Sequence, residues 1–150
     1  MGSETTAMQV LRILSLIWRS GADIYLDETD DRVAIKNPKM IPAEVMQAAE
    51  QNFQAIDDWF KSWKNANNEK ITIMKMIHQF CGWQPNEKIN EWFCAEEDSL
   101  MLFIDWTIVL ANKGWKDIYD DYRQYETAES DVIAKDLYQR AVTYMKAKKV

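Results

Sequence analysis

The chain has 150 residues, of which 47% are hydrophobic and 12% aromatic, and it carries a formal net charge of −6. Its seven Trp and other large apolar side chains are enough to build a core, which excludes a generally disordered chain. The acidic balance argues against a nucleic-acid-binding surface, because non-specific affinity for nucleic acid comes from Lys and Arg that neutralise phosphates.

The cysteine content and the N-terminal residues point to the cytoplasm. Cys81 and Cys94 are too few for a secreted disulfide scaffold. Residues 1–9 (MGSETTAMQ) lack a basic region followed by an apolar core, so we expect no signal peptide. The most apolar stretch, Ser99–Asn112, is shorter than the roughly 20 residues that cross a bilayer, so we expect no membrane segment.

The first third of the chain changes its hydrophobic period twice. Helical spacing over Ala7–Ser20 gives way to two alternating segments, Ala22–Asp27 and Arg32–Lys36, joined by the turn Glu28–Asp31. We therefore predict a helix followed by a β-hairpin. A helical pattern then runs from Pro42 to Trp63, with a break expected around Glu50–Asn52, and the turn-forming NANN of Asn65–Asn68 marks a domain boundary.

Beyond that boundary the pattern is helical throughout. We predict five helices, over Glu69–Cys81, Pro85–Phe93, Ser99–Asn112, Lys116–Tyr125 and Ala128–Lys148. Ser99–Asn112 is apolar on all sides, which predicts that other helices enclose it. The sequence thus indicates a mainly α (α+β) protein: an α-β-β-α-α unit over residues 7–66, then a helical bundle around a buried central helix over residues 69–148.

The pattern from Val10 to Trp63 resembles the small N-terminal docking domains of hybrid polyketide/non-ribosomal peptide synthetases (TubC type). The matching features are, in order, LRILSLIWRSG, a strand of the form xIYLD, a turn, the strand RVAIKNP and helices opening with IPAEV. The resemblance implies an α-β-β-α-α fold that dimerises. It also implies that an exposed strand of the hairpin receives a short peptide from another protein.

This sequence also departs from that family. A synthetase docking domain precedes a large enzyme, whereas a helical bundle of about eighty residues follows here, so the fold can persist without the function. If peptide binding persists, we expect the outward hairpin residues Tyr25, Arg32 and Lys36 to carry it. The alternative is that they form an ordinary solvated face.

A second candidate surface is acidic. Between Pro85 and Asp131 the chain has twelve acidic and four basic residues, which attracts basic partners. One interpretation is a phage- or plasmid-encoded inhibitor that covers a basic site on a host enzyme. The other is a solvated acidic face that aids solubility.

Within that segment the sequence KDIYDDYRQY predicts a row of tyrosines beside acids. Tyr122 and its neighbours at 119 and 125 recur every three residues, with Asp117, Asp120 and Asp121 beside them. An exposed row of this kind makes a good protein-binding surface. The alternative is that the tyrosine rings pack inward.

Signatures of catalysis are weak. His78, Cys81 and Cys94 offer three ligands of a zinc site but no fourth, and a buried Cys81 is normally a small hydrophobe. Asp105 stands inside the most apolar helix, where it needs a polar partner or a path to solvent, although an interface or an active site is a further possibility. No phosphate loop or Ser/His/Asp arrangement is present.

The sequence therefore predicts a non-enzymatic protein–protein interaction module with no cofactor and no metal. We expect a protein partner, a homodimer, and no binding to nucleic acid or membranes.

Overall fold

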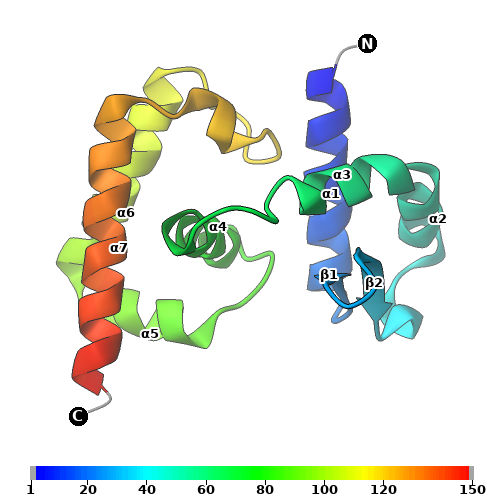
Figure 1. The fold of residues 1–150 in the computed structure, drawn as a ribbon, viewed down its shortest axis with the longest axis horizontal. Coiled ribbons are helices and arrows are strands. Elements are labelled where there is room, and N and C mark those ends of the chain that lie inside the picture. Colours follow the sequence, from blue (N-terminus) through cyan, green and yellow to red (C-terminus); the bar gives the residue numbers. More distant parts are fainter. Residues whose placement is uncertain (1–2, 149–150) are drawn as a thin grey trace. The chain divides into compact units, whose positions relative to one another are not determined.

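The computed structural model describes residues 3–148 (Figure 1). Its elements in chain order are α1 (Ser3–Arg19), β1 (Asp23–Asp27), β2 (Arg32–Lys36), the 3₁₀ helix η1 (Pro38–Met40), α2 (Ala43–Gln51), α3 (Phe53–Lys61), α4 (Asn68–Phe80), α5 (Glu87–Ala95), α6 (Glu97–Asn112), the 3₁₀ helix η2 (Tyr122–Tyr125) and α7 (Ala128–Lys148). The predicted fold class is confirmed: the described residues form a mainly helical protein with one antiparallel hairpin, in the predicted order.

The described residues divide into two compact units, each with its own core. The first runs from α1 to Ala66 and also includes the short segments Gly82–Gln84 and Tyr119–Asp121. The second comprises Asn67–Cys81, Pro85–Ile118 and the chain from Tyr122 onward. The passage from one unit to the other at Ala66–Asn67 falls inside the NANN sequence.

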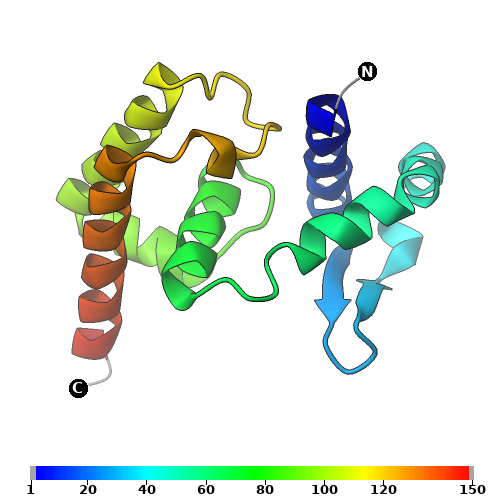
Figure 2. The ribbon, with the colours of Figure 1, turned by 45° about the horizontal axis from the view of Figure 1, so that its top comes forward.

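The first unit is built around α1. Leu14 and Ile17 on α1 have no exposed surface, and Ile24 of β1 and Ile56 of α3 are almost as deeply buried. Helix α1 contacts α2, α3 and β1, and Figures 1 and 2 both show α3 crossing it. This arrangement covers the apolar face of the hairpin, which an isolated hairpin in water would leave unprotected.

The predicted break in the second half of this unit is confirmed. Asn52 separates α2 from α3, with its backbone at φ −114° and ψ 20°, outside the helical region. Its backbone N–H (3.1 Å) and its side-chain amide (2.8 Å) both donate to the carbonyl of Ala48, which closes the last turn of α2.

The second unit packs α6 against α5 and α7, and α4 against α5 and α7. Met76, Trp106, Leu110 and Leu137 have no exposed surface, so all three long helices contribute to one core. Aromatic rings extend it, with Phe103 in contact with both Phe93 and Trp106. Large rings bury much apolar area per residue, which suits a core made from few helices.

The expectation that α6 is enclosed on all sides is wrong. Its buried stripe is Ser99, Phe103, Trp106 and Leu110, and on the opposite side Met101 and Ile108 are about half exposed (50% and 51%). Asp105 lies between them on this exposed face. Helix α6 thus supplies the centre of the core from one side only.

The predicted helix over Lys116–Tyr125 is also wrong. The chain is irregular after α6 and forms only the 3₁₀ turn η2 at Tyr122–Tyr125. Gly114 follows the end of α6 and has φ +122°.

The predicted helix α7 has the expected bounds, and its N-terminus is capped reciprocally by Thr127 and Ser130. Val132, near the start of α7, is 71% exposed.

None of the described helices has the length and apolar content needed to cross a membrane.

Candidate functional site

The hairpin presents an apolar face and a polar face. The strand register pairs Ile24 with Ile35 and Leu26 with Val33, and these side chains share one face. The other face carries Tyr25, Arg32 and Lys36, all exposed as expected, with Ala34 opposite Tyr25. Because Ala34 is small, the Tyr25 ring has no bulky cross-strand neighbour.

The two outer edges of the hairpin differ. At the β1 edge, the indole Nε1–H of Trp18 on α1 donates to the carbonyl of Ile24 (3.3 Å) and to the carboxylate of Asp23 (3.2 Å). Helix α1 therefore occupies the outer edge of β1 at Ile24. Among the described residues β2 pairs with no strand other than β1, and its backbone makes no other hydrogen bond to backbone.

The register also determines which groups β2 presents. Because the Ile24 carbonyl faces Trp18, the Ile24–Ile35 pair is one whose backbone groups point away from each other. Alternation along the strand then directs the N–H and C=O groups of Val33 and Ile35 to the outer edge. An unpaired edge of this kind is a template for an added strand.

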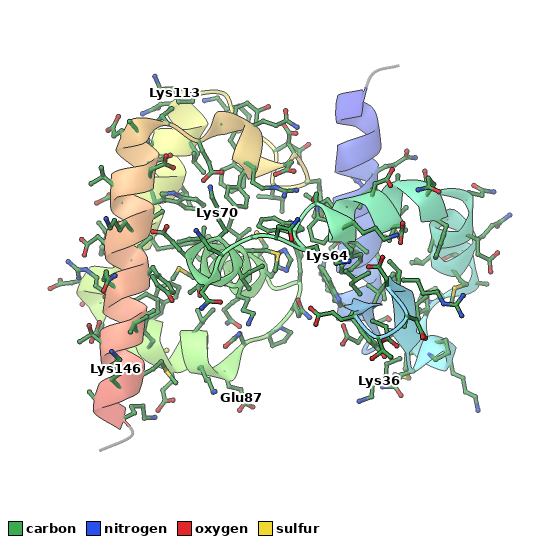
Figure 3. All side chains as sticks on the ribbon, in the orientation of Figure 1. Lys36, Lys64, Lys70, Glu87, Lys113 and Lys146 are labelled. Atoms are coloured by element: carbon green, nitrogen blue, oxygen red, sulfur yellow. The ribbon has the colours of Figure 1, made fainter. Side chains whose placement is uncertain are left out.

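Both ends of β2 are held in place. At its start, the carboxylate of Asp31 in the turn forms an ion pair with Lys64 (2.8 Å), which lowers the pKa of the Asp31 carboxyl group. At its end, Asn37 takes a left-handed conformation (φ 59°) that turns the chain into η1. Figure 3 labels Lys36 and Lys64, at the end of β2 and just after α3. Contacts and backbone geometry thus define where β2 begins and ends.

The second predicted set is divided between the two units. Asp117, Asp120 and Asp121 are half-buried, and only Asp117 belongs to the second unit. Tyr122 is 6% exposed, and its ring packs against those of Trp106 and Trp115. The distances between ring centroids are 5.4 Å and 6.3 Å. The expectation of an exposed ring at Tyr122 is wrong, because the chain here is not one helix and the ring packs into the aromatic core of the second unit.

Tyr119 belongs to the other unit and has different partners. Its ring stacks on that of Trp83 (5.5 Å between centroids, 13° between planes), and the guanidinium group of Arg12 lies 4.6 Å from its centroid. All three residues belong to the first unit. The tyrosines that recur in the sequence therefore serve separate cores.

The residues considered for metal binding or catalysis differ in their burial. His78 is buried, Cys81 is half-buried and Cys94 is exposed. Burial raises the pKa of the Cys81 thiol to about 11, which keeps it neutral and unreactive at physiological pH. The described residues contain no group of three or more His, Cys, Asp or Glu side chains placed to hold a metal ion.

The second unit contains two pockets that the sequence did not predict. A pocket of about 430 Å³ lies among α4, α6 and the segment after α6, beside the exposed Phe80 and Ile108. A second, of about 450 Å³, is formed by α4, α5 and α7. Each draws residues from helices that are distant in sequence, so no spacing motif marks it.

Comparisons with protein-family models, with curated proteins and with solved structures found no match to this chain.

Proposed function

We propose that the chain is a non-enzymatic protein-binding module that takes up a short extended segment of a protein partner along the outer edge of β2. The observation that carries this proposal is the difference between the edges: Trp18 donates to the Ile24 carbonyl on the β1 edge, while Val33 and Ile35 present unpaired backbone groups at the β2 edge. The resemblance of residues 10–63 to docking domains supports the same mode of binding.

The side chains beside this edge suggest the chemistry of the partner. A strand added to β2 places alternate side chains next to Arg32, Ala34 and Lys36 on the polar face. Acidic residues at these positions complement both charges. The intervening side chains lie beside Val33 and Ile35, which favours apolar residues there. The expected ligand alternates acidic and apolar residues.

A nine-residue peptide that alternates Glu and Val tests this proposal. Added to the full chain, it is expected to shift the amide NMR signals of Val33 and Ile35 and to slow their hydrogen exchange. A peptide of the same sequence with N-methylated Val residues cannot donate to β2 and is expected to bind at least about tenfold more weakly, since each lost hydrogen bond costs about 0.5–1.5 kcal/mol. Equal binding of the methylated peptide contradicts the proposal.

Charge reversal on the polar face provides the matched protein variants. We expect Arg32→Glu and Lys36→Glu each to weaken the peptide about two- to thirtyfold, because an attraction of about 0.2–1 kcal/mol becomes a repulsion of similar size. Lys39→Glu makes the same change in the neighbouring helix η1, away from the edge, and is the control. Equal effects from all three substitutions would mean that net charge, rather than the β2 edge, determines binding.

We also propose that the protein works as a cytoplasmic homodimer. Exposed large apolar side chains in the first unit, including Leu16 on α1 and Phe53 on α3, offer contact surface for a second copy. Sedimentation velocity from 1 to 100 µM is expected to show a dimer, and a monomer across this range contradicts it.

The acidic-inhibitor alternative has less support. The carboxylate of Glu126 pairs with Lys70, that of Glu91 pairs with Lys148, and Glu96 accepts hydrogen bonds from Trp92 and Ser99. These acids have partners within the chain, which leaves fewer charges to attract a basic site.

A further inference from the structure

The pocket formed by α4, α5 and α7 lies wholly within the second unit, and none of its lining residues belongs to the hairpin. Its volume of about 450 Å³ falls within the range of small-ligand sites. Apolar side chains from all three helices line it, namely Ile71, Ile89, Trp92, Val142 and Met145. The Trp92 indole N–H is already bonded to Glu96 (2.9 Å), so Trp92 offers the pocket apolar ring surface.

The charges around this pocket are all positive. Lys75, Lys88 and Lys146 line it, one from each helix, and no acidic residue does. Figure 3 labels Lys146 on α7. The chain as a whole has six more acidic than basic residues. The charged side chains that line this pocket are therefore opposite in sign to the net charge of the chain.

These lysines are also free to meet a ligand. None of the three forms an ion pair with a described residue, whereas the nearby Lys70 and Lys148 pair with Glu126 and Glu91. Lys75 and Lys146 have no acidic residue three or four positions away on their helices. Tyr138, also in the lining, forms no hydrogen bond through its hydroxyl with the described residues, so it remains a possible donor.

Two other pockets of the same unit lack this combination. The pocket of about 430 Å³ is lined by one charge of each sign, Lys116 and Asp117. A smaller one, of about 240 Å³, contains Glu69, Glu126 and Asp131 together with two lysines. The pocket among α4, α5 and α7 combines an apolar wall with charge of a single sign.

We propose that this pocket binds a small anionic amphiphile: an apolar chain or ring lies against Trp92, Ile89 and Val142, and a carboxylate head group lies at the lysines. The apolar wall supplies contact area, and the three ammonium groups supply selectivity for a negative charge. The expected natural ligand is a medium-chain or aromatic carboxylic acid.

Decanoate, at concentrations below those that form micelles, tests this proposal on the full chain. In a titration followed by amide NMR, we expect shifts at Ile71, Ile89 and Val142 and none at Ala111, which lines the pocket of about 430 Å³. Decanol and decyltrimethylammonium have the same chain with a neutral and a cationic head, and both are expected to bind more weakly. Decanol that binds as tightly as decanoate overturns the proposal, and so do shifts confined to Ala111 and its neighbours.

The lysines supply the protein variants. Lys75→Gln, Lys88→Gln and Lys146→Gln are each expected to weaken decanoate about 1.5- to 5-fold, the range for exposed ion pairs, and together by more. Lys113→Gln at the end of α6 removes a charge that lines neither large pocket and is the control. Unchanged affinity in the triple variant overturns the proposal. Displacement of decanoate from the same residues by a tighter-binding acidic peptide assigns the pocket to a protein partner and also overturns it.

Discussion

At the scale of single residues, side chains of the same type have different surroundings in the second unit. Cys94 on α5 is exposed, whereas the half-buried Cys81 at the end of α4 lines an apolar pocket. The sequence suggested burial for Cys81 from its place on the apolar side of a helix. Neither the degree of burial nor the effect on its pKa follows from sequence spacing, because both depend on what packs over the thiol.

We expect iodoacetamide at pH 8 to alkylate Cys94 before Cys81. The thiolate is the nucleophile, and a pKa of about 11 leaves only about one Cys81 thiol in a thousand ionised at pH 8. The rate at Cys81 should rise as the pH increases toward 11, because a raised pKa moves ionisation to higher pH. Mass spectrometry of the alkylated peptides measures both sites, and Cys94→Ser should remove the fast phase. Equal rates at pH 8 would contradict the burial of Cys81.

Gly114 provides a second prediction at this scale. Its φ of +122° suits glycine, and an added Cβ would lie 3.1 Å from the Tyr125 ring. We expect Gly114→Ala to destabilise the protein by about 1–3 kcal/mol, measured by chemical denaturation. Gly82→Ala is the matched control, because Gly82 also has positive φ but an added Cβ meets nothing within 4 Å. If both variants lose the same stability, the close approach to Tyr125 contributes nothing.

At the scale of elements, α6 shows where hydrophobic pattern stops being informative. Periodicity identifies the buried side of a helix only when polar residues mark the other side. In α6 nearly every position is apolar, so the sequence predicted enclosure, and its one interior acid, Asp105, seemed out of place. The structure turns Asp105, Met101 and Ile108 to the exposed side, which explains the carboxylate without any partner.

Adjacent substitutions in α6 test this orientation. We expect Asp105→Ala to change the free energy of unfolding by no more than about 0.5 kcal/mol, as for other surface positions. Trp106→Ala should cost about 3–5 kcal/mol, because the ring has no exposed surface and contacts Phe103, Trp115 and Tyr122. Urea denaturation measures both values. A large loss in Asp105→Ala would place this carboxylate in a buried network instead.

At the scale of the whole molecule, the first unit is not one continuous stretch of sequence. The predicted division at residues 7–66 and 69–148 omits Gly82–Gln84 and Tyr119–Asp121, which belong to the first unit. Trp83 is 2% exposed and stacks on Tyr119, whose ring meets Arg12 of α1. These contacts join residues that are far apart in the sequence, so no local sequence pattern predicts them.

We expect Trp83→Ala to loosen the first unit, since removal of a buried Trp costs about 3–5 kcal/mol. Amide hydrogen exchange in α1 should accelerate in this variant. Trp115→Ala is the control, because it removes an equally large ring from the second unit. Faster exchange in α1 from both substitutions, or from neither, would contradict the assignment of Trp83 to the first unit.

The sequence by itself determined most of the elements and their order, because caps, turn residues and period are local properties of the chain. For this reason the sequence predicted the strand Arg32–Lys36, the helix break near Asn52 and the helix cap at Thr127. It wrongly predicted a helix over Lys116–Tyr125. Only the tertiary structure decided which face of α6 is buried, that Tyr119 and Tyr122 serve different cores, and that Lys75, Lys88 and Lys146 line one pocket. Those outcomes depend on contacts between distant segments, and side-chain spacing along the chain carries no information about them.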